Sequence, residues 1–109
     1  MKISELAEKT GLKAANTYVD REVQGVYISD MVSDIITSAK PSSVIVTLQT
    51  HKSLIAAANL VAAAMVVVVK GRQPSDDVVE LATRSGIAVF VSASDTWAFA
   101  KKLTQLGFE

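Results

Sequence analysis

Three short apolar runs constrain the fold of this chain more than any other feature of its sequence. They are VIVTL (44–48), MVVVV (65–69) and IAVFV (87–91), and all three are uninterrupted and rich in β-branched residues. Such runs are typical of strands that are covered on both faces. The runs recur every 21 or 22 residues, with helical patterns between them. This spacing predicts βα units, a parallel sheet and right-handed crossovers.

Helical patterns occupy the segments that separate these runs. Segment 52–64 is almost entirely apolar, whereas 75–85 and 94–106 begin with serine and acidic residues, as helix starts commonly do. Another apolar stripe has helical spacing and is formed by Met31, Val32, Ile35, Ile36 and Ala39. An apolar residue follows each of three glycines that are expected to end helices in the left-handed conformation: Gly11, Gly86 and Gly107.

Together these elements predict a single α/β domain over 1–109, with a mostly parallel sheet of four to five strands and helices on both faces. A short N-terminal helix comes first, and a strand is expected near 12–16. The less uniformly apolar segment 23–29 is predicted to be a strand nearer the sheet edge. A length of 109 residues suits one hydrophobic core and not two.

Composition excludes several classes of function. The 11 basic and 11 acidic residues give zero net charge, and no basic run is present, which argues against nucleic-acid binding. The chain has no cysteine and one histidine, so we expect neither a metal site nor a cofactor. No segment is apolar and long enough to span a membrane or to act as a secretion signal, so a cytoplasmic protein is expected.

Polar residues follow each predicted strand, at the edge where open parallel sheets bind ligands. Hydroxyls, two cations and the histidine could hold a nucleotide, a phosphate or another small anion. The alternative is that they only cap the helices that follow. The candidate ligand-binding residues at this edge are Ser29, Asp30, Thr47, Thr50, His51, Lys70, Arg72 and Ser92.

Catalysis has little support in the sequence. His51 could be oriented by Asp30 or Asp95 and activate a serine. However, the chain has no G-x-S-x-G motif and no second histidine, and Thr50-His51 is a common capping pair. We therefore predict no catalytic residue.

The stretch VDREVQGVYISD (19–30) carries a more specific signal. Asp20-Arg21 precedes Gly25, which is expected to adopt a positive φ in a turn. Asp20, Arg21 and Gly25 are also candidate ligand-binding residues. The Arg21 fork could clamp a carboxylate, a phosphate or a neighbouring subunit; the alternative is that the Asp-Arg pair is structural and fixes the turn. Further motifs follow in order: Ser29-Asp30, Ser33-Asp34, Gln49-Thr50-His51 and Gly71-Arg72-x-Pro74.

This series of motifs resembles the DRTGG domain, and the likeness covers nearly the whole chain. Val26 stands where that family often has a second glycine. DRTGG domains are similar to the N-terminal domain of HPr kinase/phosphorylase and, more distantly, to the uridine-nucleotide-binding domain of Mur ligases. The Asp20-Arg21 pair and the loop beginning at Lys40 each lack a residue of the Mur ligase pattern.

The resemblance implies a non-catalytic regulatory, ligand-sensing or protein-interaction module. Such modules are often fused to CBS domains, pyrophosphatases or phosphotransacetylases, and some stand-alone members are associated with iron-only hydrogenase systems. The sequence thus predicts a module acting with a partner enzyme; the alternative is a nucleotide or phosphate sensor at the carboxyl edge of the sheet.

Self-association is a further prediction. The nearly all-apolar helix at 52–64 either packs centrally on the sheet or presents an outer face to another subunit. Zero net charge does not oppose association. A homodimer is therefore expected, with surface contributed by Leu54, Ile55, Ala58, Val61 or Ala62.

Overall fold

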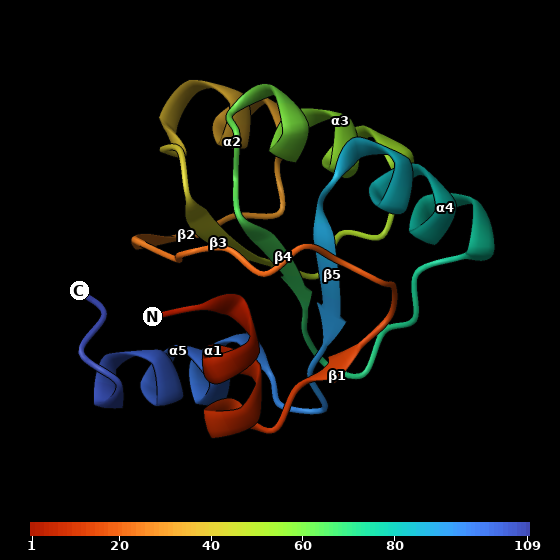
Figure 1. Cartoon of the computed structure of the whole chain (residues 1–109). Helices are drawn as coiled ribbons and strands as arrows, with labels where there is room; N and C mark the ends of the chain where they lie inside the picture. Colours follow the sequence, from red (N-terminus) through yellow and green to blue (C-terminus); the bar gives the residue numbers. More distant parts are fainter.

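A computed structural model describes all residues, 1–109, as one five-stranded sheet with five helices (Figure 1). The strand order is β1-β5-β4-β3-β2. Strands β2 to β5 are parallel, and β1 pairs with β5 in the antiparallel direction. The elements are α1 (Ile3–Thr10), β1 (Lys13–Ala14), β2 (Gly25–Ile28), α2 (Val32–Ser38), β3 (Ser43–Thr47), α3 (Lys52–Leu60), β4 (Met65–Val68), α4 (Asp76–Ser85), β5 (Ala88–Val91) and α5 (Thr96–Gln105).

The layers follow from this strand order. Strands β2, β3, β4 and β5 are neighbours in sequence and in the sheet, so right-handed crossovers place their connecting helices on one face. Figure 1 shows α2, α3 and α4 on that face, and α1 and α5 on the other. The predicted α/β class, the parallel sheet and the helices on both faces are confirmed.

The core lies on both sides of the three central strands. Val46 and Phe90 pack towards α1 and α5, whereas Ile45, Val66 and Val89 pack towards α2, α3 and α4. Every residue of β3, β4 and β5 is buried, as the uninterrupted apolar runs predicted. None of the helices is long and apolar enough to cross a membrane.

The glycine signals at the helix ends are confirmed. Gly11, Gly86 and Gly107 have φ values of 71°, 74° and 98°. In each case the N–H of the next residue donates a hydrogen bond to a carbonyl of the preceding helix; Leu12 N, for example, donates to Ala7 O at 3.0 Å.

Helix α3 is shorter than predicted. It ends at Leu60 and does not continue to residue 64. Ala62 adopts φ = 57°, and Ala63 N donates to Ala58 O at 2.9 Å, which ends the helix in the same way as the glycines do. An alanine in the left-handed conformation gives no sequence signal for a helix end, which explains the error.

The apolar surface expected on α3 is also largely absent. Leu54, Ile55 and Ala58 are at most 1% exposed, because α3 lies on the sheet between α2 and α4 and contacts both. Of the five residues proposed for an interface, three are buried, Val61 is partly exposed and Ala62 is exposed. The central position of α3 explains its composition.

The predicted stripe on α2 is only partly buried. Ile35 is fully buried, but Met31 and Ile36 are 64% and 42% exposed. Helix α2 lies over the edge of the sheet, so it has a neighbouring helix, α3, on one side only.

Candidate functional site

Asp20 caps a helix that is distant in the sequence. Lys2 precedes α1 and provides no side-chain cap. Instead, the Asp20 carboxylate accepts hydrogen bonds from Ser4 N at 3.0 Å and from Ser4 Oγ at 2.5 Å. These bonds to Ser4 hold the pKa of Asp20 below its ordinary value. Asp20 therefore stabilises the first turn of α1.

Arg21 lies at the end of another helix. Its carbonyl accepts a hydrogen bond from Ile3 N at 2.9 Å. Its guanidinium is close to Gly86, because a Cβ on that glycine would be 3.3 Å from Arg21 Nη2. Gly86 ends α4, where the helix dipole favours a positive charge. Both residues of the Asp-Arg pair thus contact helix ends.

Gly25 differs from its prediction. It is the first residue of β2 and pairs with Ser43 of β3. Its φ is not positive, so the expected glycine turn is wrong. A Cβ at this position would meet no atom within 4 Å. The backbone conformation and the neighbouring atoms therefore do not require glycine here.

Asp30 links the ends of two strands at the carboxyl edge, the edge where β2 to β5 end. Its Oδ1 accepts hydrogen bonds from Thr47 Oγ1 at 3.1 Å and from Leu48 N at 2.7 Å. Gln49 Nε2 donates to its backbone carbonyl at 3.4 Å. The neighbouring Ser29 Oγ accepts from Met31 N at 3.1 Å. Asp30 and Thr47 are therefore engaged with each other, and the Ser29 hydroxyl is engaged by a backbone N–H.

His51 is the N-cap of α3. Its Nδ1 accepts from Ser53 N at 3.2 Å and lies 3.0 Å from Ser53 Oγ. Accepting a backbone N–H requires an unprotonated Nδ1, so the neutral ring carries its proton on Nε2. The ring has no hydrogen bond to Asp30 or Asp95; the Asp95 carboxylate instead accepts from Ala98 N and caps α5. Thr50 is half-buried beside it and makes no side-chain hydrogen bond.

The loop after β4 carries the cations. Lys70 and Gly71 have φ values of 61° and 64°, and their N–H groups donate to Ser94 O at 2.8 Å and Ser92 O at 2.7 Å. Ser92 Oγ accepts from Ser94 N at 3.1 Å. The backbone donors are therefore occupied. The side chains of Lys70 and Arg72 are exposed and form no ion pair.

The candidate residues do not form one site. Asp30 and Thr47 are hydrogen-bonded to one another, Ser29 Oγ accepts from Met31 N, and the loop containing Lys70 is bonded to the loop containing Ser92. Asp20, Arg21 and Gly25 lie at the opposite, amino edge, because they precede or begin β2. Sequence reasoning placed the Asp-Arg motif and the polar loops together as ligand groups, and the fold separates them.

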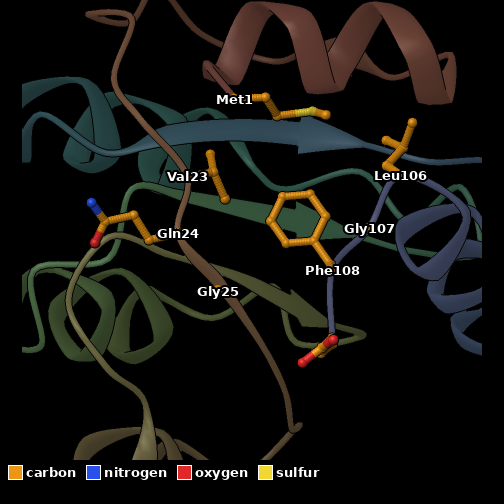
Figure 2. A pocket seen from close by; sticks show the side chains of 8 residues that line it. Met1, Val23, Gln24, Gly25, Leu106, Gly107 and Phe108 are labelled. Carbon is orange, nitrogen blue, oxygen red and sulfur yellow. The ribbon is translucent and has the colours of Figure 1, made fainter.

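Three hollows surround the start of β2 and the end of the chain. One of about 370 Å³ is lined by Met1, Val23, Gln24, Gly25, Leu106, Gly107, Phe108 and Glu109, and Figure 2 shows Val23 and Phe108 pointing towards one another in it. An apolar one of about 330 Å³ lies between β2 and α5. A polar one of about 510 Å³, here called the Gly25 cleft, is lined by Gln24, Gly25, Val26, Tyr27, Ser38, Lys40, Pro41, Ser43 and Glu109.

Of the residues that line these three hollows, only Gly25 was predicted from the sequence as a site residue. Tyr27, in the Gly25 cleft, donates a hydrogen bond to Asp34 Oδ2 at 2.8 Å. This bond raises the pKa of Tyr27 and lowers that of Asp34. The available signal was the segment Lys40-Pro41-Ser42-Ser43, which leads into a buried strand and ends at Ser43, the residue that pairs with Gly25.

Comparison with known proteins identifies the domain. The sequence matches the DRTGG domain over residues 5–106. The fold is similar to the crystal structure of the CBS and DRTGG domains of the regulatory region of Clostridium perfringens pyrophosphatase, complexed with the activator diadenosine tetraphosphate. The TM-score is 0.74, with 14% identity over 94% of this chain and 46% of that one, so this chain spans about half its length. No curated protein matches the sequence. Because the match extends over almost the entire chain, the protein belongs to the DRTGG domain family.

Proposed function

We propose that this chain is a non-catalytic regulatory and ligand-sensing module that acts on a partner enzyme. The observation that carries the proposal is how the polar groups at the carboxyl edge are used. The Asp30 carboxylate joins two strand ends, His51 Nδ1 caps α3, and Ser92 Oγ accepts a backbone N–H. The groups that a hydrolase would require as base and nucleophile are engaged in maintaining the fold.

The structural relative supports the regulatory part of the proposal. Its DRTGG domain belongs to the regulatory region of a pyrophosphatase, and that region was crystallised with a nucleotide activator. We propose a corresponding partner for this chain, namely an iron-only hydrogenase or another metabolic enzyme system.

We also propose that the chain forms a homodimer. Helix α3 is enclosed, so the support comes from zero net charge and from the exposed apolar side chains of Ile28, Met31 and Ile36 on the adjoining elements β2 and α2. Sedimentation equilibrium at high micromolar concentration tests this proposal. A single species of 11.6 kDa would reject it.

A thermal-shift screen against nucleotides, including diadenosine tetraphosphate, tests the ligand-sensing function. A ligand present at 100 times its Kd adds roughly 2.7 kcal/mol to the free energy of unfolding. The non-catalytic part fails if a hydrolase or transferase activity is found that His51→Ala abolishes while the circular dichroism spectrum is unchanged.

The second candidate function is a nucleotide or phosphate sensor at the carboxyl edge. It is favoured by the exposed, unpaired cations Lys70 and Arg72 on a loop that is held in place by bonds from its backbone to Ser92 and Ser94. Replacing both cations with alanine should abolish binding of a phosphate ligand at this edge. Lys101→Ala, which removes an exposed lysine of α5, serves as the control.

A further inference from the structure

The Gly25 cleft contains the one buried side-chain polar atom that no protein group bonds. Ser43 lines this cleft, is 3% exposed, and its Oγ has no hydrogen-bond partner. Leaving a buried hydroxyl without a partner lowers the stability of the fold. Buried polar groups are nearly always satisfied in folded proteins, so the exceptions call for an explanation.

The location of Ser43 explains how a ligand could provide that partner. Ser43 is directly opposite Gly25 in the parallel pair β2–β3. Both residues share the face of Tyr27 and Ile45, which is covered by α2 and α3. Since Gly25 has no side chain and its Cβ position is empty to 4 Å, the space above the start of β2 remains open. A side chain at position 25 would occupy that space.

The remaining lining defines the chemistry of the ligand. Lys40 is exposed, forms no ion pair, and follows the end of α2 at the cleft. It supplies a positive charge for an anionic group. Gln24 also lines this cleft, and its side chain points away from Phe108 in Figure 2. The ring of Tyr27 and the ring of Pro41 provide apolar surface, and Glu109 provides a carboxylate that favours N–H donors.

We infer that the Gly25 cleft binds a small organic phosphate of nucleoside monophosphate size. The phosphate would lie at Lys40, the Ser43 hydroxyl would bond a polar group of the ligand, and the base would contact Tyr27 and Pro41. A volume of about 510 Å³ is within the range usual for small-molecule sites. This inference rests on the proposed ligand-sensing function and assigns that function to the amino edge of the sheet, not to the carboxyl edge.

The test is a titration of the ¹⁵N-labelled chain with AMP and CMP, followed by the backbone amide signals. Adenosine and inorganic phosphate serve as partial ligands. We expect saturable shifts of the Gly25, Lys40 and Ser43 amides, with AMP or CMP binding at least tenfold more tightly than either partial ligand. Gly25→Ala and Lys40→Ala should each weaken binding at least tenfold, and Lys101→Ala should leave the Kd unchanged.

Gly25→Ala is suitable because the strand conformation accepts alanine and the space is free, so the fold should persist. An unchanged amide spectrum outside the cleft verifies this. If Gly25→Ala does not fold, the affinity of Lys40→Ala tests the inference. This variant should fold, since the Lys40 side chain is exposed and makes no ion pair. Unchanged affinity in the folded variants overturns the inference, as does equal affinity for adenosine and AMP.

The result also separates this inference from the proposed function. Shifts confined to Lys70 and Arg72 would reject the Gly25 cleft but retain a nucleotide sensor at the carboxyl edge. If AMP and CMP shift no amide, the cleft assignment is wrong. The sensing function then depends on the wider nucleotide screen, and fails only if no ligand there raises the melting temperature.

Discussion

Replacing Ala62 with glycine should stabilise the fold, although glycine is unfavourable inside a helix. Ala62 lies two residues beyond α3 with φ = 57°, and its side chain is exposed. The left-handed conformation costs an L-residue with a Cβ roughly 1–2 kcal/mol, and glycine avoids this. Against this gain, the greater conformational freedom of glycine in the unfolded chain lowers the free energy of unfolding by about 0.4–1 kcal/mol. The net gain expected is about 0.5–1 kcal/mol.

Ala56→Gly provides a matched control. Ala56 is an exposed residue inside the same helix, so the chemical change is identical while the backbone is right-handed. Glycine there should lower the free energy of unfolding by about 0.8–1 kcal/mol. The two variants should therefore differ in sign.

Urea unfolding followed by far-ultraviolet circular dichroism measures both changes. A gain of this size should raise the melting temperature of Ala62→Gly by roughly 2–8 °C. The m-values should stay close to that of the parent chain, because neither variant changes the surface exposed on unfolding. If Ala62→Gly is as destabilising as Ala56→Gly, position 62 is not left-handed and α3 extends beyond Leu60.

Three further predictions concern stability. Ser43→Ala should raise the free energy of unfolding by about 1 kcal/mol in thermal or urea unfolding, because it removes the unbonded buried hydroxyl; a loss of stability would show that Ser43 Oγ is satisfied. Asp20 has a lowered pKa, so its stabilisation of α1 is present above the ordinary carboxyl pKa and is lost as the pH falls through the lowered value. Asp20→Ala should therefore be less stable than the parent at neutral pH and equally stable in strong acid, whereas a constant difference across the pH range would contradict this linkage. Ala58→Glu should prevent folding, because Ala58 is fully buried between α3 and the sheet. A variant that folds would contradict this burial, and one that is monomeric where the parent chain is dimeric would show that this face meets another subunit.

The features predicted correctly from the sequence are encoded by neighbouring residues. The run at 65–69 is apolar throughout because both faces of β4 are covered, and Gly86 ends α4 because it tolerates a positive φ. Ser75 caps α4 because its Oγ accepts a hydrogen bond from Val78 N, three residues away, at 3.4 Å. Each of these signals is complete within a few positions, so the sequence alone is sufficient to interpret it.

The sequence predictions are wrong where a residue contacts a partner that is distant in the sequence, or where it adopts a backbone conformation that its identity does not indicate. Asp20 acts on Ser4, 16 residues earlier, and no pattern in the stretch 19–30 indicates that partner. Ala62 is a good helix former and nothing in its identity indicates a left-handed residue. The apolar character of α3 was consistent with central packing on the sheet and with an outer face that meets another subunit. Only the strand order shows that α2 and α4 flank it.

The motif residues now fall into two groups according to whether the fold explains them. Asp20 caps α1, Asp30 joins β2 to β3, and His51 caps α3, so each has a structural role. Gly25 has none, because its φ is not positive and a Cβ would fit without contact. Even at the first position of a strand, glycine lacks a side chain to pack and loses more entropy on folding than other residues do. The proposed ligand would make use of this open position, and Ser43 beside it has a hydroxyl without a partner. The two observations have different physical origins and indicate the same cleft.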